Sequence, residues 1–180
     1  GNLYAVNDGS HTINVYPTEG GAPGIIADVN DGVIAGGAIA LSPGDDLYYS
    51  PNTYNRIYRF SSDGGGGLFD QLPQGQAIYS LATTEDGTLF TITNVGIYRY
   101  VNGESDRREL FSTFEGRQGI STLAMSPDGQ TLFSTFGPAL FAIDPTTGAF
   151  SQIGSIPFEN EYLPGPGLAV YVPEPSAACV

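Results

Sequence analysis

Residues 126–143 of the 180-residue chain read SPDGQTLFSTFGPALFAI. The stretch consists of a turn sequence, an apolar strand, a short second turn and another apolar strand. Its Asp-Gly pair suits a tight turn, because glycine tolerates the positive φ that such turns require. Alternating apolar strands on either side of an Asp-Gly turn predict a β-hairpin.

The same hairpin pattern occurs four times along the chain. Its first strands begin near Leu3, Leu47, Leu89 and Leu132, and these leucines are 44, 42 and 43 residues apart. A period near 43 residues that contains only strands is typical of a β-propeller, in which each repeat is one four-stranded blade. We therefore expect an all-β fold, a β-propeller of four blades over residues 1–172.

The remaining strands of each blade are placed by their position relative to the hairpins. Strands that lead into the turn before each hairpin are expected to be innermost in the second, third and fourth blades, at residues 38–43, 78–82 and 120–125. Strands that follow each hairpin are expected to be outermost, at residues 25–26, 68–69, 109–111 and 150–153.

The first repeat lacks an innermost strand, and the C-terminal region contains a spare one at residues 167–172. Its Leu168 follows Leu123 by 45 residues, close to the spacing between the other innermost strands. We expect this strand to return and complete the first blade, which closes the ring and removes an unpaired sheet edge. The alternative is that the four blades belong to a larger ring formed by a longer chain.

The chain is strongly acidic, with a net charge of −13 from 19 carboxylates and six arginines. Such a surface repels phosphate backbones and anionic membranes, so we expect no nucleic-acid partner. The sequence has no apolar run long enough to span a bilayer, and we expect no membrane insertion by the chain as given. The charge is compatible with solubility, with binding of a divalent cation or with a basic partner.

Residues suited to catalysis are scarce. The chain has one histidine, His11 on a turn, and one cysteine, Cys179 near its end. Triads of the Ser-His or Cys-His type and zinc sites each need more of these residues in one place. The innermost strands carry no Asp, Glu, Asn or His that could hold a catalytic metal in a central channel, although turn residues at the channel mouth remain an alternative. We expect no catalytic residue and no cofactor.

Acidic residues on the hairpin turns are candidate cation ligands. The turns before the second, third and fourth hairpins contain Asp45, Asp46, Glu85, Asp86 and Asp128. Propeller symmetry would place them on one face, where carboxylate oxygens could bind Ca²⁺. The alternative is that each serves its own glycine-containing turn.

Two arginines occupy matching strand positions beside tyrosines: Arg59 next to Tyr58, and Arg99 next to Tyr98. Such Arg–Tyr pairs could form an adhesive or sugar-binding surface. Alternatively, the long arginine side chains cover aromatic surface at outward positions of the strands.

Two segments resemble known families. Residues 3–16 resemble the YVTN-type propeller repeat, and residues 126–133 resemble the SPDG-x-x-L turn of WD40-like and lactonase-like propellers. The resemblance implies the fold, and such relatives include lactonases, cell-surface proteins and surface-layer proteins. Pro173-Glu174-Pro175 resembles the start of a PEP-CTERM sorting signal, so residues 173–180 form a sorting tail in this interpretation. That resemblance implies location outside the cell or on the surface of a bacterium.

These observations together predict a non-catalytic, secreted or cell-surface propeller that mediates protein or polysaccharide contacts in an extracellular matrix or assembly. Its partners would be other extracellular proteins or polysaccharide, with self-association as an option. One alternative is a structural subunit of a filament or layer, in which the terminal strand pairs with a neighbouring molecule. Another is a lactonase-like, metal-dependent hydrolase with its metal at the channel mouth.

Overall fold

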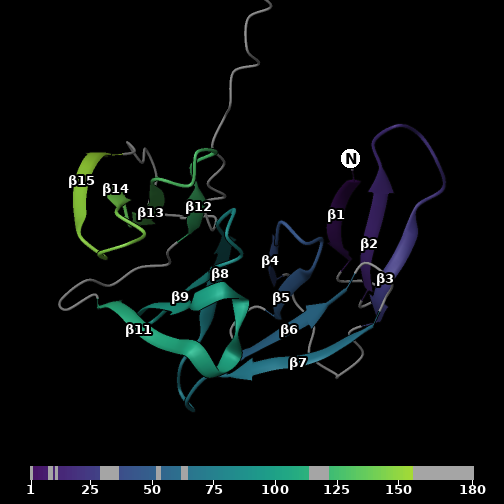
Figure 1. Cartoon of the computed structure of the whole chain (residues 1–180), viewed down its shortest axis with the longest axis horizontal. Helices are drawn as coiled ribbons and strands as arrows, with labels where there is room; N and C mark the ends of the chain where they lie inside the picture. The colour runs from purple at the N-terminus through teal and green to yellow at the C-terminus, as the bar shows by residue number, and fades with distance from the viewer. Residues whose placement is uncertain are drawn as a thin grey trace, which may run out of the picture.

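The computed structural model describes residues 2–7, 10, 12–28, 37–51, 54–61, 65–113 and 122–155. These residues form fifteen strands in four antiparallel sheets, and we refer to the sheets as blades I to IV (Figure 1). Blade I contains β1 (Asn2–Asn7), β2 (Thr12–Pro17) and β3 (Gly24–Asp28). Blade II contains β4 (Gly37–Leu41), β5 (Leu47–Pro51), β6 (Arg56–Phe60) and β7 (Gly66–Gln71).

Blade III contains β8 (Ile78–Thr83), β9 (Leu89–Thr93), β10 (Gly96–Tyr100) and β11 (Arg108–Thr113). Two 3₁₀ turns, η1 (Val101–Gly103) and η2 (Ser105–Arg107), connect its last two strands. Blade IV contains β12 (Leu123–Met125), β13 (Leu132–Phe136), β14 (Ala139–Ile143) and β15 (Phe150–Ser155). In each blade the strands pair in chain order, as the repeat pattern predicts.

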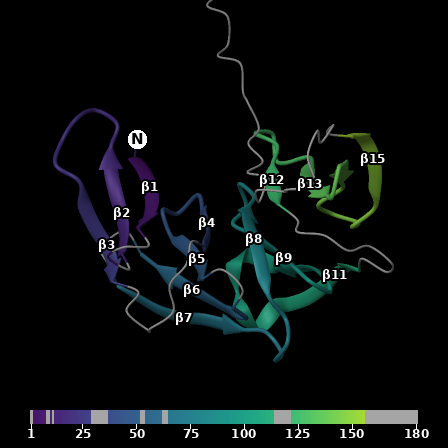
Figure 2. The same cartoon turned by 180° about the vertical axis from the view of Figure 1, so that it is seen from behind.

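The four blades follow one another along an arc. Figures 1 and 2 show β4, β8 and β12 on the inside of the arc and β3, β7, β11 and β15 on the outside. The predicted innermost and outermost strands are therefore confirmed in their order. Among the described residues blade I has three strands, and β1, the first of them, corresponds to the second strand of the other blades. The expected closing strand at residues 167–172 lies outside the described residues, so ring closure stays a prediction.

The outermost strand of every blade contains a β-bulge. In blade II, Ile57 pairs with Asp70 and Tyr58 pairs with Leu68, so the pairing skips Phe69. Equivalent shifts skip Ile26, Phe111 and Ile153 in the other blades. A bulge bends its strand and redirects a side chain. Ile26, Phe69 and Phe111 accordingly pack against buried clusters of the hydrophobic core.

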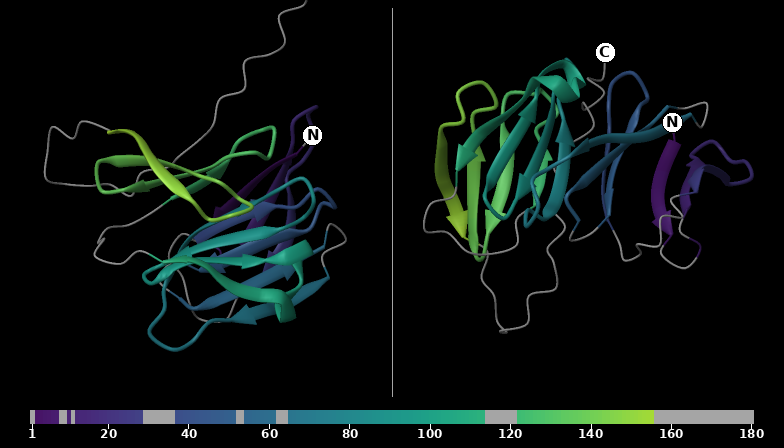
Figure 3. Two further views of the ribbon diagram at one scale, coloured as in Figure 1. Left: turned by 60° about the vertical axis from the view of Figure 1, so that its left-hand side comes forward. Right: turned by 90° about the horizontal axis from the view of Figure 1, so that it is seen from below.

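The hydrophobic core lies between blades rather than inside them. One cluster joins Ile13 of blade I to Leu47 and Phe60 of blade II. A second joins blades II and III, and a third joins blades III and IV. The right-hand view of Figure 3 shows the sheets standing side by side. Blades II and III therefore bury both faces against their neighbours, and blades I and IV each bury one face in the same way. A blade cannot bury its apolar surface alone.

Hydrogen bonds between the innermost strands add to this packing. The Ser80 hydroxyl of β8 accepts a hydrogen bond from the amide of Leu123 on β12 at 3.0 Å. The Thr83 hydroxyl of β8 donates to the carbonyl of Leu41 on β4 at 2.5 Å. Strand β8 is thus tied to both neighbouring blades. No helix among the described residues is long and apolar enough to cross a membrane.

Candidate functional site

The acidic turns of blades III and IV share one hydrogen-bond pattern. In blade III, Asp86 Oδ1 accepts hydrogen bonds from the Thr84 hydroxyl and, at 3.0 Å, from the Thr88 amide. In blade IV, Asp128 Oδ1 accepts from the Ser126 hydroxyl at 2.6 Å and from the Gln130 amide at 3.1 Å. Each carboxylate closes its own turn, as aspartate does in many turns of this kind.

These hydrogen bonds keep both carboxyl groups ionised. The Thr84 hydroxyl and then the Thr88 amide lower the pKa of Asp86 below its usual value. The Ser126 hydroxyl and the Gln130 amide do the same for the pKa of Asp128. A carboxyl with a lowered pKa is a poor general acid at neutral pH and acts as a fixed hydrogen-bond acceptor.

The first aspartate of the blade II turn lies one position later in the turn than the aspartates of blades III and IV. Asp45 has φ +63°, and the residues with the same conformation in blades III and IV are Gly87, at +83°, and Gly129, at +68°. Gly44 thus stands where the other blades have Asp86 and Asp128. The prediction of equivalent turns is correct for the turns, but the acidic residues within them are not equivalent.

The neighbouring Asp46 is engaged within blade II. Its carboxylate forms an ion pair with Arg59, and its amide donates to the Ser42 hydroxyl at 3.1 Å. Within the described ranges, no three His, Cys, Asp or Glu side chains lie close enough together to hold a metal ion. The bonds at Asp86 and Asp128 fit the interpretation in which each aspartate serves its own turn.

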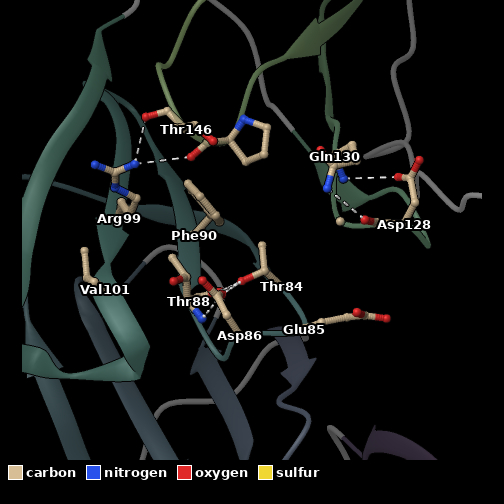
Figure 4. A pocket seen from close by; sticks show the side chains of 12 residues that line it. Thr84, Glu85, Asp86, Thr88, Phe90, Arg99, Val101, Asp128, Gln130 and Thr146 are labelled. Carbon is tan, nitrogen blue, oxygen red and sulfur yellow. Dashed lines mark hydrogen bonds between the residues drawn. The ribbon is translucent and has the colours of Figure 1, made fainter.

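A cleft of about 470 Å³ lies between blades III and IV and brings several predicted residues together. Glu85, Asp86, Asp128 and Arg99 all line it. Figure 4 shows the turn of blade III along one side, Asp128 and Gln130 of blade IV along another, and Arg99 near Thr146. Asp45, Asp46 and Arg59 do not line this cleft; Asp46 and Arg59 border a separate hollow between blades II and III.

Arg99 is a link between blades III and IV. Its guanidinium forms an ion pair with Glu109 on the adjacent strand. The same group donates to the carbonyls of Pro145 and Thr146 in blade IV, at 3.2 and 3.1 Å, and lies 4.4 Å from the ring centre of Phe111. Most of its donors are thus used inside the molecule, and it closes one end of the cleft.

The two tyrosines of the predicted Arg–Tyr surface are covered to different extents, whereas Arg59 is exposed. Tyr98 is buried, and Tyr58 is half-buried with its ring tilted against Tyr49. The guanidinium of Arg59 lies 5.9 Å from the ring centre of Tyr48. This geometry matches the alternative in which the arginines cover aromatic surface.

A polar network between blades II and III was not predicted from the sequence. The Tyr100 hydroxyl donates to Asp70 Oδ2 at 2.9 Å, and Arg108 Nη1 donates to the same oxygen at 2.7 Å. Burial, followed by the nearby charge of Asp70, raises the pKa of Tyr100. Asp70 and Arg108 carry opposite charges and both lie on outermost strands, but no pattern in the sequence shows that they pair across 38 positions.

Further cleft residues were also missed, among them Phe90, Thr84, Thr88 and Gln130. The repeated pattern of a hydroxyl residue two positions before an aspartate could have indicated Thr84. Outside the described residues lie His11, Cys179 and the predicted sorting motif Pro173-Glu174-Pro175.

No protein-family model matches the sequence, and no curated protein is significantly similar to it. Solved structures do match. A streptogramin B lyase structure covers 89% of the chain with a TM-score of 0.70 and 19% identity. Virginiamycin B lyase from Staphylococcus aureus covers 89% with a TM-score of 0.69 and 17% identity. The chain is a β-propeller. A gluconolactonase from Xanthomonas campestris gives a TM-score of 0.61 over 87% of the propeller chain, at 17% identity.

The propeller chain is shorter than these structures. It spans 53% of the streptogramin B lyase chain, 54% of the virginiamycin B lyase chain and 59% of the gluconolactonase chain. At such identities the likeness shows the fold alone, because one fold carries many unrelated functions.

Proposed function

We propose that this protein is a non-catalytic propeller, secreted or held at the surface of a bacterium, that mediates contacts with polysaccharide or protein in an extracellular matrix. The observation that carries the proposal is the chemistry of the cleft between blades III and IV. Asp86 and Asp128 are fixed by their own turns with lowered pKa values, so the cleft offers ionised acceptors rather than groups ready to exchange a proton.

A polysaccharide with many hydroxyl groups fits this cleft best. Sugar hydroxyls would donate to the carboxylates of Glu85, Asp86 and Asp128, and Gln130 supplies an amide. The net charge of −13 favours a neutral or basic polymer over an acidic one. The location outside the cell rests on the tail at residues 173–175 and its resemblance to a sorting signal.

The test is binding of the purified chain to immobilised neutral and basic polysaccharides, compared between two variants of equal charge change. Glu85→Gln alters an exposed cleft residue, and Glu19→Gln alters an exposed residue on a turn of blade I. Loss of one charge-assisted hydrogen bond should weaken binding about tenfold for Glu85→Gln. Equal affinities for both variants would show that the cleft is not the polysaccharide-binding site. Absence of binding to every polymer would contradict a polysaccharide ligand and favour a protein partner.

The alternative function is a lactonase-like, metal-dependent hydrolase, for which the likeness to gluconolactonase structures is a reason at the level of fold only. One assay distinguishes the two proposed functions. Hydrolysis of simple sugar lactones that is abolished by a chelator and restored by a divalent cation would favour the enzyme. We expect no hydrolysis above the rate of the uncatalysed reaction.

A further inference from the structure

The two ends of the arc expose apolar side chains that every internal blade buries. Leu3, Leu47, Leu89 and Leu132 are equivalent residues in blades I to IV. The last three are 2%, 0% and 0% exposed, but Leu3 is 62% exposed. Their cross-strand partners Phe60, Tyr100 and Ile143 are 7%, 0% and 2% exposed, whereas Tyr16, the partner of Leu3, is 39% exposed.

Blade IV, at the other end of the arc, shows the same difference in exposure on its outer face. Ile13, Ile57 and Ile97 precede the bulge in blades I to III, and each is 0% exposed. Leu140 holds that position in blade IV and is only partly buried. The bulge residues Ile26, Phe69 and Phe111 pack against the core, but Ile153 is 52% exposed.

The direction of packing explains both differences. Leu47, Leu89 and Leu132 face the preceding blade, and Ile13, Phe69 and Phe111 face the following one. In the described arc, no blade precedes blade I and none follows blade IV (Figure 1). The exposed face of blade I is therefore apolar where other blades pack against a preceding blade. The exposed face of blade IV is apolar where other blades pack against a following one.

We propose that a second copy of this chain covers both faces, with blade IV of each copy packed against blade I of the other. The two contacts are identical and repeat the three contacts between neighbouring blades of one chain. A head-to-tail contact forms a closed ring when its rotation closes, and otherwise forms a fibre.

The curvature of the arc argues for two copies rather than one. The four blades superpose on 53% of the streptogramin B lyase chain with a TM-score of 0.70, so they are arranged as in a propeller about twice as large. A closed ring of this curvature needs about twice as many blades as the four that one chain supplies. Figures 1 and 2 show blades I and IV at opposite ends of the arc, where a single copy does not bring its own two faces together.

The first measurement is the solution mass of the full chain by light scattering over a range of concentrations. We expect twice the chain mass of 18.9 kDa. A mass equal to one chain at every concentration would overturn the proposal, because it would leave the faces open or covered within one chain. A ladder of larger assemblies would overturn the closed pair in favour of a fibre.

The second measurement uses variants at the two faces. Leu3→Asp and Ile153→Asp each place a charge in both contacts and should give single chains that keep the far-ultraviolet circular dichroism of the wild type. Leu68→Asp is the matched control, since Leu68 is 56% exposed on an outermost strand but lies in an internal blade. It should leave the pair intact. A pair that survives both face variants would contradict the assigned contact.

Mixing the two face variants gives a sharper test of the head-to-tail arrangement. In a mixed pair, unaltered blade IV of the Leu3→Asp chain meets unaltered blade I of the Ile153→Asp chain. One of the two contacts is then restored, so the mixture should regain twice the chain mass while each variant alone does not. A mixture of single chains would show that the two residues do not belong to opposite sides of one contact.

Discussion

At the residue scale, the turn of blade II carries a strain that the other turns avoid. Asp45 adopts φ +63°, where its counterparts in blades III and IV are glycines. The left-handed region costs a residue with a Cβ atom more than it costs glycine, although aspartate tolerates it better than most. The carboxylate of Asp45 is therefore not placed as those of Asp86 and Asp128 are.

We predict that Asp45→Gly stabilises the protein by about 1 kcal/mol, as measured by urea unfolding. Gly129→Ala is the converse control. Its φ is +68° and nothing lies within 4 Å of the added methyl group, so any loss of stability comes from backbone strain alone. If Asp45→Gly destabilises the protein, the aspartate side chain has a role that outweighs its strain.

The lowered pKa of Asp86 predicts how stability changes with pH. Because the folded pKa lies below the reference value of 3.8, the ionised group stabilises the fold fully above that pH. This contribution disappears as the pH falls from 3.8 through the folded pKa. Asp86→Asn keeps an oxygen acceptor without a titrating group, so its stability should fall less across this range. Thermal unfolding at a series of pH values checks this, and parallel curves for both proteins would contradict it.

At the element scale, the blades are held together by contacts between strands that are far apart in sequence. The network of Asp70, Tyr100 and Arg108 joins β7 to β10 and β11 and lies partly inside the core. Removing one partner of a buried polar group costs more than the net value of the hydrogen bond, because the remaining groups lose their solvation without compensation.

We predict that Asp70→Ala lowers the free energy of unfolding by about 1–3 kcal/mol, since it leaves the Tyr100 hydroxyl without its acceptor. Glu104→Ala breaks the exposed ion pair with Arg107 and serves as the control, with an expected change of less than about 1 kcal/mol. Chemical denaturation of both variants makes the comparison. Equal effects would mean that the buried network contributes no more than a surface pair.

The order of the strands could be predicted from the sequence, and the contacts between blades could not. Alternating apolar residues and Asp-Gly turns are patterns within fewer than ten residues. They indicate a strand whatever that strand packs against. The Asp70–Arg108 pair depends on how one sheet is rotated against the next, which no local pattern records. The shift of Asp45 by one position within its turn was also not predicted, because the residue types of a turn do not by themselves show which residue has positive φ.

The same distinction applies to the candidate site. The acidic turn residues Glu85, Asp86 and Asp128 were found from their repeated positions, and all three line one cleft. That Arg99 closes this cleft through the carbonyls of Pro145 and Thr146 depends on the packing of blade III on blade IV. Matching strand positions suggested an exposed surface, whereas Arg99 is mostly covered and Tyr98 is buried.

At the scale of the whole molecule, the acidic surface does not by itself make a cation site. Asp86 and Asp128 each accept two hydrogen bonds within their own turns, and Asp46 is paired with Arg59. At both aspartates the two bonds are accepted by Oδ1, so a calcium ion that used this oxygen would have to displace them.

We therefore predict that neither millimolar Ca²⁺ nor a chelator changes the melting temperature by more than the effect of ionic strength. Differential scanning calorimetry with Ca²⁺, with Mg²⁺ and with a chelator checks this, and Mg²⁺ controls for screening of the surface charge. An upward shift specific to Ca²⁺ would identify a site that the described turns do not reveal, because a ligand that binds only the folded state stabilises it.

The bonds between innermost strands have a consequence for how such a chain can change in length. Ser80 and Thr83 reach Leu123 and Leu41, which lie 43 and 42 residues away, one repeat in each direction. Both bonds thus join one repeat to the next. Duplication or loss of a whole repeat in the gene therefore leaves each remaining blade with a neighbour of the right shape. Unequal recombination could alter the number of blades in a single step, without the compensating substitutions that an ordinary core would require.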